Sequence, residues 1–150
     1  MVVAKANSSF VCYVELKIPR HERSYRELVE SVAHLLQAYQ LQHRAVVVSF
    51  NLAALTYVKE VDAAICTGAL FEPRTPTPMQ NRSMMIRAQR CGAQEILLHR
   101  LMATQRTIES AHTAGLAPVV WTVDDGRWIR RAERLGIHAL ITNRPAKLIT

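Results

Sequence analysis

Glu15 and Lys17 are the first residues whose types and spacing suggest chemistry in this chain of 150 residues. They lie near the end of an apolar run, within FVCYVELKIPRHERS at residues 10–24, that has the composition of a buried strand. Side chains two residues apart on a strand point to the same side. A carboxylate and an ammonium group therefore face one environment, where the chain enters a polar loop. The pair is either an ion pair that ends a strand or part of a site that handles charge.

Strand and helix patterns alternate along the chain. Strands are expected at 13–17, 45–50, 63–68, 95–99, 117–123 and 138–142. Helices are expected between them, at 24–41, 51–61, 82–92, 104–115 and 126–136. Ser24 and Glu27 match a capping box, Asn51 is a candidate N-cap, and the last three helices end at glycines. This alternation predicts a parallel sheet with right-handed crossovers.

Two architectures contain such a sheet, a doubly wound open sheet and a (β/α)8 barrel, and six strands are too few for a complete barrel. A chain of 150 residues fits one domain, which we expect to span residues 1–150. The segment LFEPRTPTPMQN at 70–81 is rich in proline and predicts a long loop. Long loops in compact domains often carry function.

The composition, with 49% hydrophobic and 21% charged residues, is that of a globular protein. No apolar run reaches the roughly 18 residues that a membrane span needs, and no leader pattern opens the chain. Cys12, Cys66 and Cys91 lie in or beside apolar sequence and are expected to be buried thiols rather than disulfide partners. We therefore expect a soluble, cytoplasmic protein.

The net charge of +7, supplied mainly by arginine, favours anionic partners such as phosphate compounds or nucleic acid. The arginines are scattered, however, and no run of five basic residues occurs. Nucleic-acid binding would need the arginines of residues 82–90 and 127–134 on one connected surface. We expect a small phosphate ligand, and no nucleic acid, as the partner.

Five passages, read in order, resemble the glycerophosphodiester phosphodiesterase family: VELK, VVVSF, AAICTGAL, AHTAGLAPVVWTVDD and LGIHALITNRP. In that family one barrel strand ends in Glu-Leu-Lys and the next in Ser-Phe, and a later helix leads into Val-Trp-Thr-Val. The resemblance covers nearly all of residues 11–146. It implies a partial (β/α)8 barrel with about six of the eight parallel strands, and an open doubly wound sheet is the alternative.

By this resemblance Glu15 is a ligand of a divalent metal, Mg²⁺ or Ca²⁺, and Lys17 contacts the substrate phosphate. Oxygen ligands suit a hard cation, and positive charge neutralises phosphate oxygens as their charge builds up. Trp121 matches the tryptophan that lines the family's glycerol pocket. Phe50 matches the phenylalanine of Ser-Phe, which is expected to line the wall of that pocket. Either residue could instead be a core residue. Leu70, with the proline-rich segment after it, is expected at the rim.

Other motifs of the family have no counterpart in this sequence. They are a His-Arg-Gly strand end, a Glu-x-Asp pair that completes the metal site, and a His-Asp hairpin. Because the histidines among them are the family's general acid and base, no catalytic residue is assigned here. His21 lies near Glu15 in sequence and His99 ends a strand, but neither matches these motifs. Asn143 stands where the family has aspartate, which removes a charge near the last strand.

The resemblance implies a phosphoric diester hydrolase that cleaves glycerophosphodiesters to an alcohol and glycerol 3-phosphate. We expect this activity to be impaired or absent in the chain as it stands. The alternative is a non-catalytic partial barrel that binds phosphate ligands. A barrel short of two strands leaves two edges unpaired, so the sequence also predicts a homodimer or completion by another chain.

Overall fold

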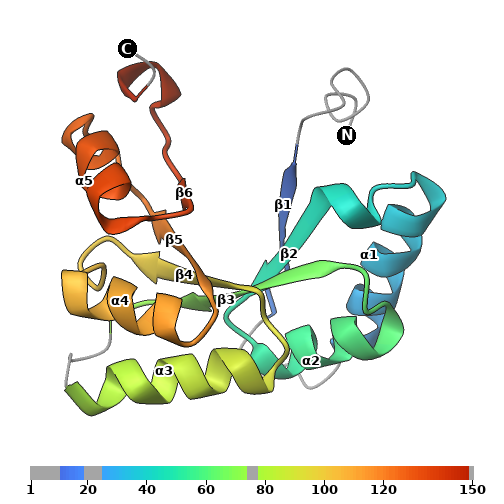
Figure 1. Cartoon of the computed structure of the whole chain (residues 1–150). Coiled ribbons are helices and arrows are strands. Elements are labelled where there is room, and N and C mark those ends of the chain that lie inside the picture. The colour runs from blue at the N-terminus through green and yellow to red at the C-terminus, as the bar shows by residue number, and fades with distance from the viewer. Residues whose placement is uncertain (1–10, 19–24, 74–77, 149–150) are drawn as a thin grey trace.

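The computed structural model describes residues 11–18, 25–73 and 78–148, without the side chains of 78–80. Strands and helices alternate throughout these residues (Figure 1). The strands are β1 Cys12–Glu15, β2 Ala45–Ser49, β3 Cys66–Phe71, β4 Glu95–His99, β5 Ala117–Trp121 and β6 Ala139–Leu140. The α-helices are α1 Arg26–Ala38, α2 Leu52–Val61, α3 Pro78–Arg90, α4 Gln105–Thr113 and α5 Arg127–Leu135, with short 3-10 turns at Gln42–Arg44 and Pro145–Lys147.

All neighbouring strands pair in parallel, in the order β1-β2-β3-β4-β5-β6. A doubly wound sheet reverses its strand order at a switch point, so the strand order excludes that alternative. The sheet instead curls into a partial (β/α)8 barrel with the helices outside it (Figure 1). Among the described residues, β1 pairs only with β2 and β6 only with β5. Homodimer formation through these two edges remains a prediction.

Local sequence signals set the ends of several helices. Asn51 caps α2, where its side-chain oxygen accepts a hydrogen bond from the Ala54 N–H at 3.2 Å. Thr104 caps α4 in the same way, through the Thr107 N–H. The residues that follow α3, α4 and α5 include a glycine with positive φ, which ends each helix as the sequence predicts.

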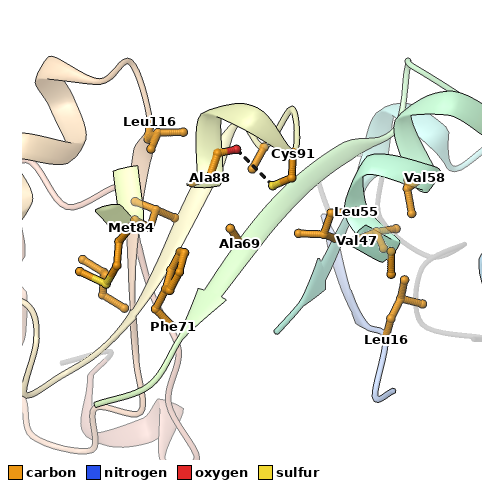
Figure 2. Close-up of a cluster of buried hydrophobic side chains, with 14 of the residues drawn as sticks. Leu16, Val47, Leu55, Val58, Ala69, Phe71, Met84, Ala88, Cys91 and Leu116 are labelled. Atoms are coloured by element: carbon orange, nitrogen blue, oxygen red, sulfur yellow. Dashed lines mark hydrogen bonds between the residues drawn. The ribbon is translucent and has the colours of Figure 1, made fainter. Parts of the chain in front are cut away.

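The convex face of the sheet packs against the helices and forms the main core. Val47, Ala69 and Phe71 of the strands meet Leu55 of α2 and Met84 of α3 (Figure 2). Cys91, also in this core, donates a hydrogen bond to the Ala88 carbonyl at 3.1 Å (Figure 2). The helices therefore cover one side of the sheet only.

The concave face holds a second apolar cluster made of strand residues. Side chains alternate along each strand, so the residues between those of the main core face inward. Val46, Val48, Leu70, Leu97 and Val119 are all buried there, against Trp121 and Ile141. The curl of the sheet thus lets the inner face bury its own apolar side chains.

Three sequence-based expectations need correction. The third strand was expected at 63–68 but runs from Cys66 to Phe71, because Asp62 accepts the Ala64 N–H at 2.9 Å in a turn. The first helix begins at Arg26 without a side-chain cap, and Ser24 lies outside the described residues. Of the three cysteines only Cys91 is buried, since Cys12 and Cys66 are partly exposed, and all three are free thiols.

The outer helices do not bring the arginines of α3 and α5 side by side. Helix α4 lies between them and packs against both (Figure 1). This arrangement gives no support to a nucleic-acid interface built from those two helices. No helix in the described part of the chain combines the length and apolar character needed to cross a membrane.

Gly68 faces the concave side, where the side chains of Leu97 and Val48 leave no room for a larger residue. A Cβ atom there would overlap the Leu97 side chain and come within 3.0 Å of Val48 Cγ1. We expect Gly68→Ala to lower the free energy of unfolding by roughly 1–3 kcal/mol, because overpacking a close-packed cluster forces side chains from their rotamers.

Urea denaturation of Gly68→Ala, Leu97→Ala and the double variant measures this effect. Leu97→Ala opens space beside residue 68, so the double variant should be destabilised by less than the sum of the single changes. Simple additivity would contradict the proposed steric conflict.

Candidate functional site at the carboxyl ends of the strands

The carboxyl ends of the six strands form a mouth at one end of the partial barrel. Active sites of (β/α)8 enzymes lie at this end. Glu15, paired in register with Val48, and Trp121, paired with His99, face inward here. Phe50 follows β2 directly. Four predicted site residues, Glu15, Lys17, Phe50 and Trp121, therefore lie at the same end of the sheet.

Glu15 and Lys17 form an exposed ion pair at the edge strand. Their charged atoms are 3.9 Å apart, and the side chains are 38% and 81% exposed. Such pairs contribute about 0–1 kcal/mol to stability, so the fold does not depend on the pair. Both side chains line a cavity of about 320 Å³ together with Phe50. Both side chains are therefore accessible to a ligand. This cavity favours the interpretation of the pair as part of a site over that of an ion pair that only ends a strand.

Ser49 fixes the backbone between the two charged residues. Its buried hydroxyl donates to the Leu16 carbonyl at 2.9 Å and accepts the Asn51 N–H at 3.0 Å. Leu16 also donates its N–H to the Val48 carbonyl at 2.8 Å. The β1 end is thereby held against the β2 end, and the two charges stay beside Phe50.

Three rings from different strand ends meet across the mouth. Phe50 packs edge-on against Trp121, with ring centroids 5.9 Å apart, and His99 packs against the same indole at 5.1 Å. His99 Nδ1 accepts the Leu101 N–H, so the neutral ring carries its proton on Nε2. The Trp121 Nε1–H is enclosed and has no hydrogen-bond partner among the described residues. An enclosed donor without an acceptor is unfavourable, which makes this indole a candidate ligand contact.

Leu70 lies within β3 and not in the loop where the sequence placed it. It is 7% exposed and lines a larger cavity of about 530 Å³ with Phe50 and Arg87. The proline-rich loop is shorter than expected, since β3 extends to Phe71 and α3 begins at Pro78. Its residues 74–77 lie outside the described residues, as does His21.

Asp124 is a residue of the mouth that sequence reasoning missed. Its Oδ1 accepts hydrogen bonds from the Thr142 hydroxyl and the Asn143 N–H, each at 2.9 Å. These bonds join the end of β5 to the residues after β6, and they hold the pKa of Asp124 below its usual value. The acidic pair that follows Trp-Thr-Val in the sequence could have signalled this role. Asp124 accepts the backbone N–H of Asn143, so its carboxylate lies beside the position where the family has an aspartate and this chain has an asparagine.

A hard divalent cation takes six or more oxygen ligands. The described residues contain no group of three or more His, Cys, Asp or Glu side chains arranged to hold a metal. Glu15 contributes one carboxylate to the mouth, and the Asp124 carboxylate accepts hydrogen bonds from Thr142 and Asn143. The described residues therefore do not by themselves form a complete site for such a cation.

Comparison with protein families decides the relationship of this chain. The model of the Glycerophosphoryl diester phosphodiesterase family matches residues 2–147. The chain belongs to this family. A comparison of the phosphodiesterase-family chain with curated protein sequences finds no match.

Solved structures of related proteins have the same fold. A protein of Silicibacter pomeroyi, assigned as a glycerophosphoryl diester phosphodiesterase, is 26% identical with a TM-score of 0.79. One from Galdieria sulphuraria, assigned as a glycerophosphodiester phosphodiesterase, is 20% identical with a TM-score of 0.83. An Oleispira antarctica phosphodiesterase, determined with the product sn-glycerol-3-phosphate, is 18% identical with a TM-score of 0.65.

These matches cover 92%, 99% and 92% of this family member but only 48%, 59% and 53% of the three solved chains. The chain thus spans about half the length of the structures that it matches. The expected partial barrel is thereby confirmed as the fold of this phosphodiesterase-family chain.

Thr142→Val should raise the pKa of Asp124, because the hydroxyl that stabilises the carboxylate is removed. A depressed folded-state pKa contributes stability that is present above the unfolded-state pKa and is lost as the pH falls through the folded-state pKa. The variant should therefore lose this contribution at a higher pH than the wild type.

NMR titration of the side-chain carboxyl groups measures the change. Asp125 is the internal control, because its pKa of about 2 is set by Arg127 and should not move. An unchanged Asp124 titration in Thr142→Val would show that the hydroxyl does not stabilise the carboxylate.

Proposed function

We propose that this chain supplies the Glu15 and Lys17 part of a glycerophosphodiester phosphodiesterase site. The net reaction is hydrolysis: water adds to phosphorus, the phosphorus–oxygen bond to the alcohol breaks, and glycerol 3-phosphate and the alcohol are released. The cavity that Glu15, Lys17 and Phe50 share at the carboxyl ends of the strands carries this proposal. Membership of the family and the product-bound Oleispira antarctica protein support it.

Lys17 is proposed to bind the substrate phosphate. Its side chain is 81% exposed, and among the described residues its ammonium group lies 3.9 Å from the Glu15 carboxylate. A phosphate oxygen can therefore approach it without breaking a buried interaction. Charge-assisted hydrogen bonds to phosphate are stronger than neutral ones. The free energy that Lys17 contributes to ligand binding should therefore exceed the stability lost when its ion pair with Glu15 is broken.

Trp121 and Phe50 are proposed to line the glycerol side of the pocket, with Leu70 below them. The unpaired Trp121 Nε1–H could donate to a glycerol hydroxyl. Phe50 is 43% exposed, and its ring offers apolar surface to the carbon chain of glycerol.

Glu15 is proposed as one ligand of a divalent metal, Mg²⁺ or Ca²⁺, which would neutralise charge on the phosphate oxygens when bound. Water or further carboxylates must supply the remaining ligands. The family resemblance assigns those carboxylates to a Glu-x-Asp pair on a strand that precedes Glu-Leu-Lys. We accordingly expect weak metal binding and little turnover from these 150 residues alone.

A second candidate function is metal-independent binding of phosphate compounds. It is favoured by the lack of a metal-ligand group among the described residues, combined with the accessible Lys17. The two functions differ in their need for Glu15, which only the phosphodiesterase uses as a metal ligand.

Release of glycerol 3-phosphate from glycerophosphocholine, with Mg²⁺ or Ca²⁺, tests the first function. The wild-type chain should release little glycerol 3-phosphate, and we expect Glu15→Gln to lower that release to the level without enzyme, because losing a direct ligand should cost no less than the roughly 10- to 100-fold typical of losing its outer-shell support. Glu133→Gln, an exposed change on α5, is the matched control and should keep the wild-type rate. Turnover that survives in Glu15→Gln would contradict the role of this carboxylate.

Binding of sn-glycerol 3-phosphate, measured by calorimetry, tests Lys17. We expect Lys17→Ala to weaken binding about two- to fivefold, the effect of one exposed charge pair. Arg134→Ala removes the same unit of charge from an exposed position on α5 and should leave the affinity unchanged. Equal losses in both variants would mean that net charge, and not Lys17, attracts the ligand.

A further inference from the structure

Tyr13 reaches across the concave face of the partial barrel. Its hydroxyl donates to the Glu95 carboxylate, with distances of 3.0 Å to Oε2 and 3.2 Å to Oε1. Tyr13 belongs to β1 and Glu95 to β4, and strands β2 and β3 lie between them in the sheet. The hydrogen bond is thus a direct link from the edge strand to the middle of the sheet.

Glu95 is an unusual residue to find inside this face. It is only 5% exposed, and burial raises the pKa of its carboxyl group, an effect that the Tyr13 hydrogen bond partly offsets. His138 also lies close, with its Nε2 3.8 Å from Oε1. A buried carboxylate needs hydrogen-bond donors, and the Tyr13 hydroxyl is the donor that lies within hydrogen-bond distance of both oxygens.

Gly68 lies beside Glu95 in the sheet. It pairs in register with Val48 on one side and Glu95 on the other. A Cβ atom at position 68 would lie 3.5 Å from Glu95 Cβ and would overlap Leu97. The glycine therefore lets the side chains of β2 and β4 close over β3 next to Glu95.

The link has a consequence for the mouth of the barrel. β1 has four residues and lies at the edge, where its ladder to β2 is its only strand pairing in the described chain. Tyr13 and Glu15 are two residues apart and face the same side. Whatever holds Tyr13 therefore also limits how far Glu15 can move from Phe50 and Trp121.

We propose that Tyr13 and Glu95 are a positioning pair, which holds the edge strand β1 in the curl of the sheet and keeps Glu15 and Lys17 at the mouth. Neither residue touches the substrate in this proposal. The link itself depends only on the fold. Its effect on ligand binding rests on the function proposed above for Glu15 and Lys17.

Hydrogen–deuterium exchange of the 150-residue chain tests the link. We expect Tyr13→Phe and Glu95→Leu each to speed exchange of the β1 amides about tenfold, since a hydrogen bond to a charged group is strong enough for such a change. Glu95→Gln keeps an oxygen that accepts the Tyr13 hydroxyl but loses the charge, so its rate should lie between those of the wild type and Tyr13→Phe. The double variant Tyr13→Phe with Glu95→Leu should exchange no faster than either single one.

Tyr57→Phe is the matched control, because it removes a tyrosine hydroxyl bonded to a carboxylate, Glu30, on the exposed side of α1 and α2. It should leave β1 exchange unchanged. Amides of β5 serve as an internal reference in every variant, since a general loss of stability would speed them too. Unchanged β1 exchange in Tyr13→Phe overturns the link.

Titration with sn-glycerol 3-phosphate separates the link from its effect on the mouth. Weaker binding in Tyr13→Phe, with a smaller loss in Glu95→Gln, supports the positioning role. Faster β1 exchange with unchanged affinity overturns that role. A wild-type chain that fails to bind the ligand overturns the proposed function and the positioning role with it, while the exchange rates still decide the link.

Discussion

A parallel sheet has two faces, and in this chain the helices between the strands pack against one of them. The strands are apolar on both sides, so the second face also has to leave water. Curling the sheet solves this, because Val48, Leu97 and Val119 then bury one another on the concave side. The curl draws the strand ends into a mouth, and every feature of the candidate site depends on that geometry.

The mouth combines groups with different demands on the fold. Phe50, His99 and Trp121 pack against each other and help to fill the space between strand ends. Glu15 and Lys17 lie beside Phe50 but are exposed on the edge strand, where their mutual attraction contributes little stability. Because the fold does not need these two charged groups for its stability, they are available to bind a charged ligand. That distinction makes the ion pair, and not the aromatic rings, the more informative place to test function.

Sequence patterns predicted much of this structure. The alternation of patterns predicted a parallel sheet, Asn51 predicted a helix start, and the residues Glu-Leu-Lys predicted which strand end carries charge. These signals are local, or they are shared with a known family. The start of β3 was wrong by three residues because a turn at Asp62 competes with the apolar sequence after it. Leu70 was consequently placed in a loop although it lies in a strand.

Other features could not be predicted because they join distant parts of the chain. Tyr13 and Glu95 are 82 residues apart in sequence. No sequence motif around either residue predicts the contact between them. From sequence alone, a glycine at position 68 would be expected to weaken a strand. In the structure the side chains of Leu97 and Val48 occupy the space where a side chain at this position would lie. Such contacts depend on the radius of the curl, which no local pattern encodes.

The contact between Asp124 and Asn143 depends on the backbone of residue 143 and not on its side chain. Asp124 accepts the backbone N–H of residue 143, and every amino acid except proline carries that group. An asparagine at this position therefore leaves the connection between β5 and the end of β6 intact. Thr142 differs, because its side-chain hydroxyl makes the second bond to Asp124, and a residue without a side-chain donor there would lose it.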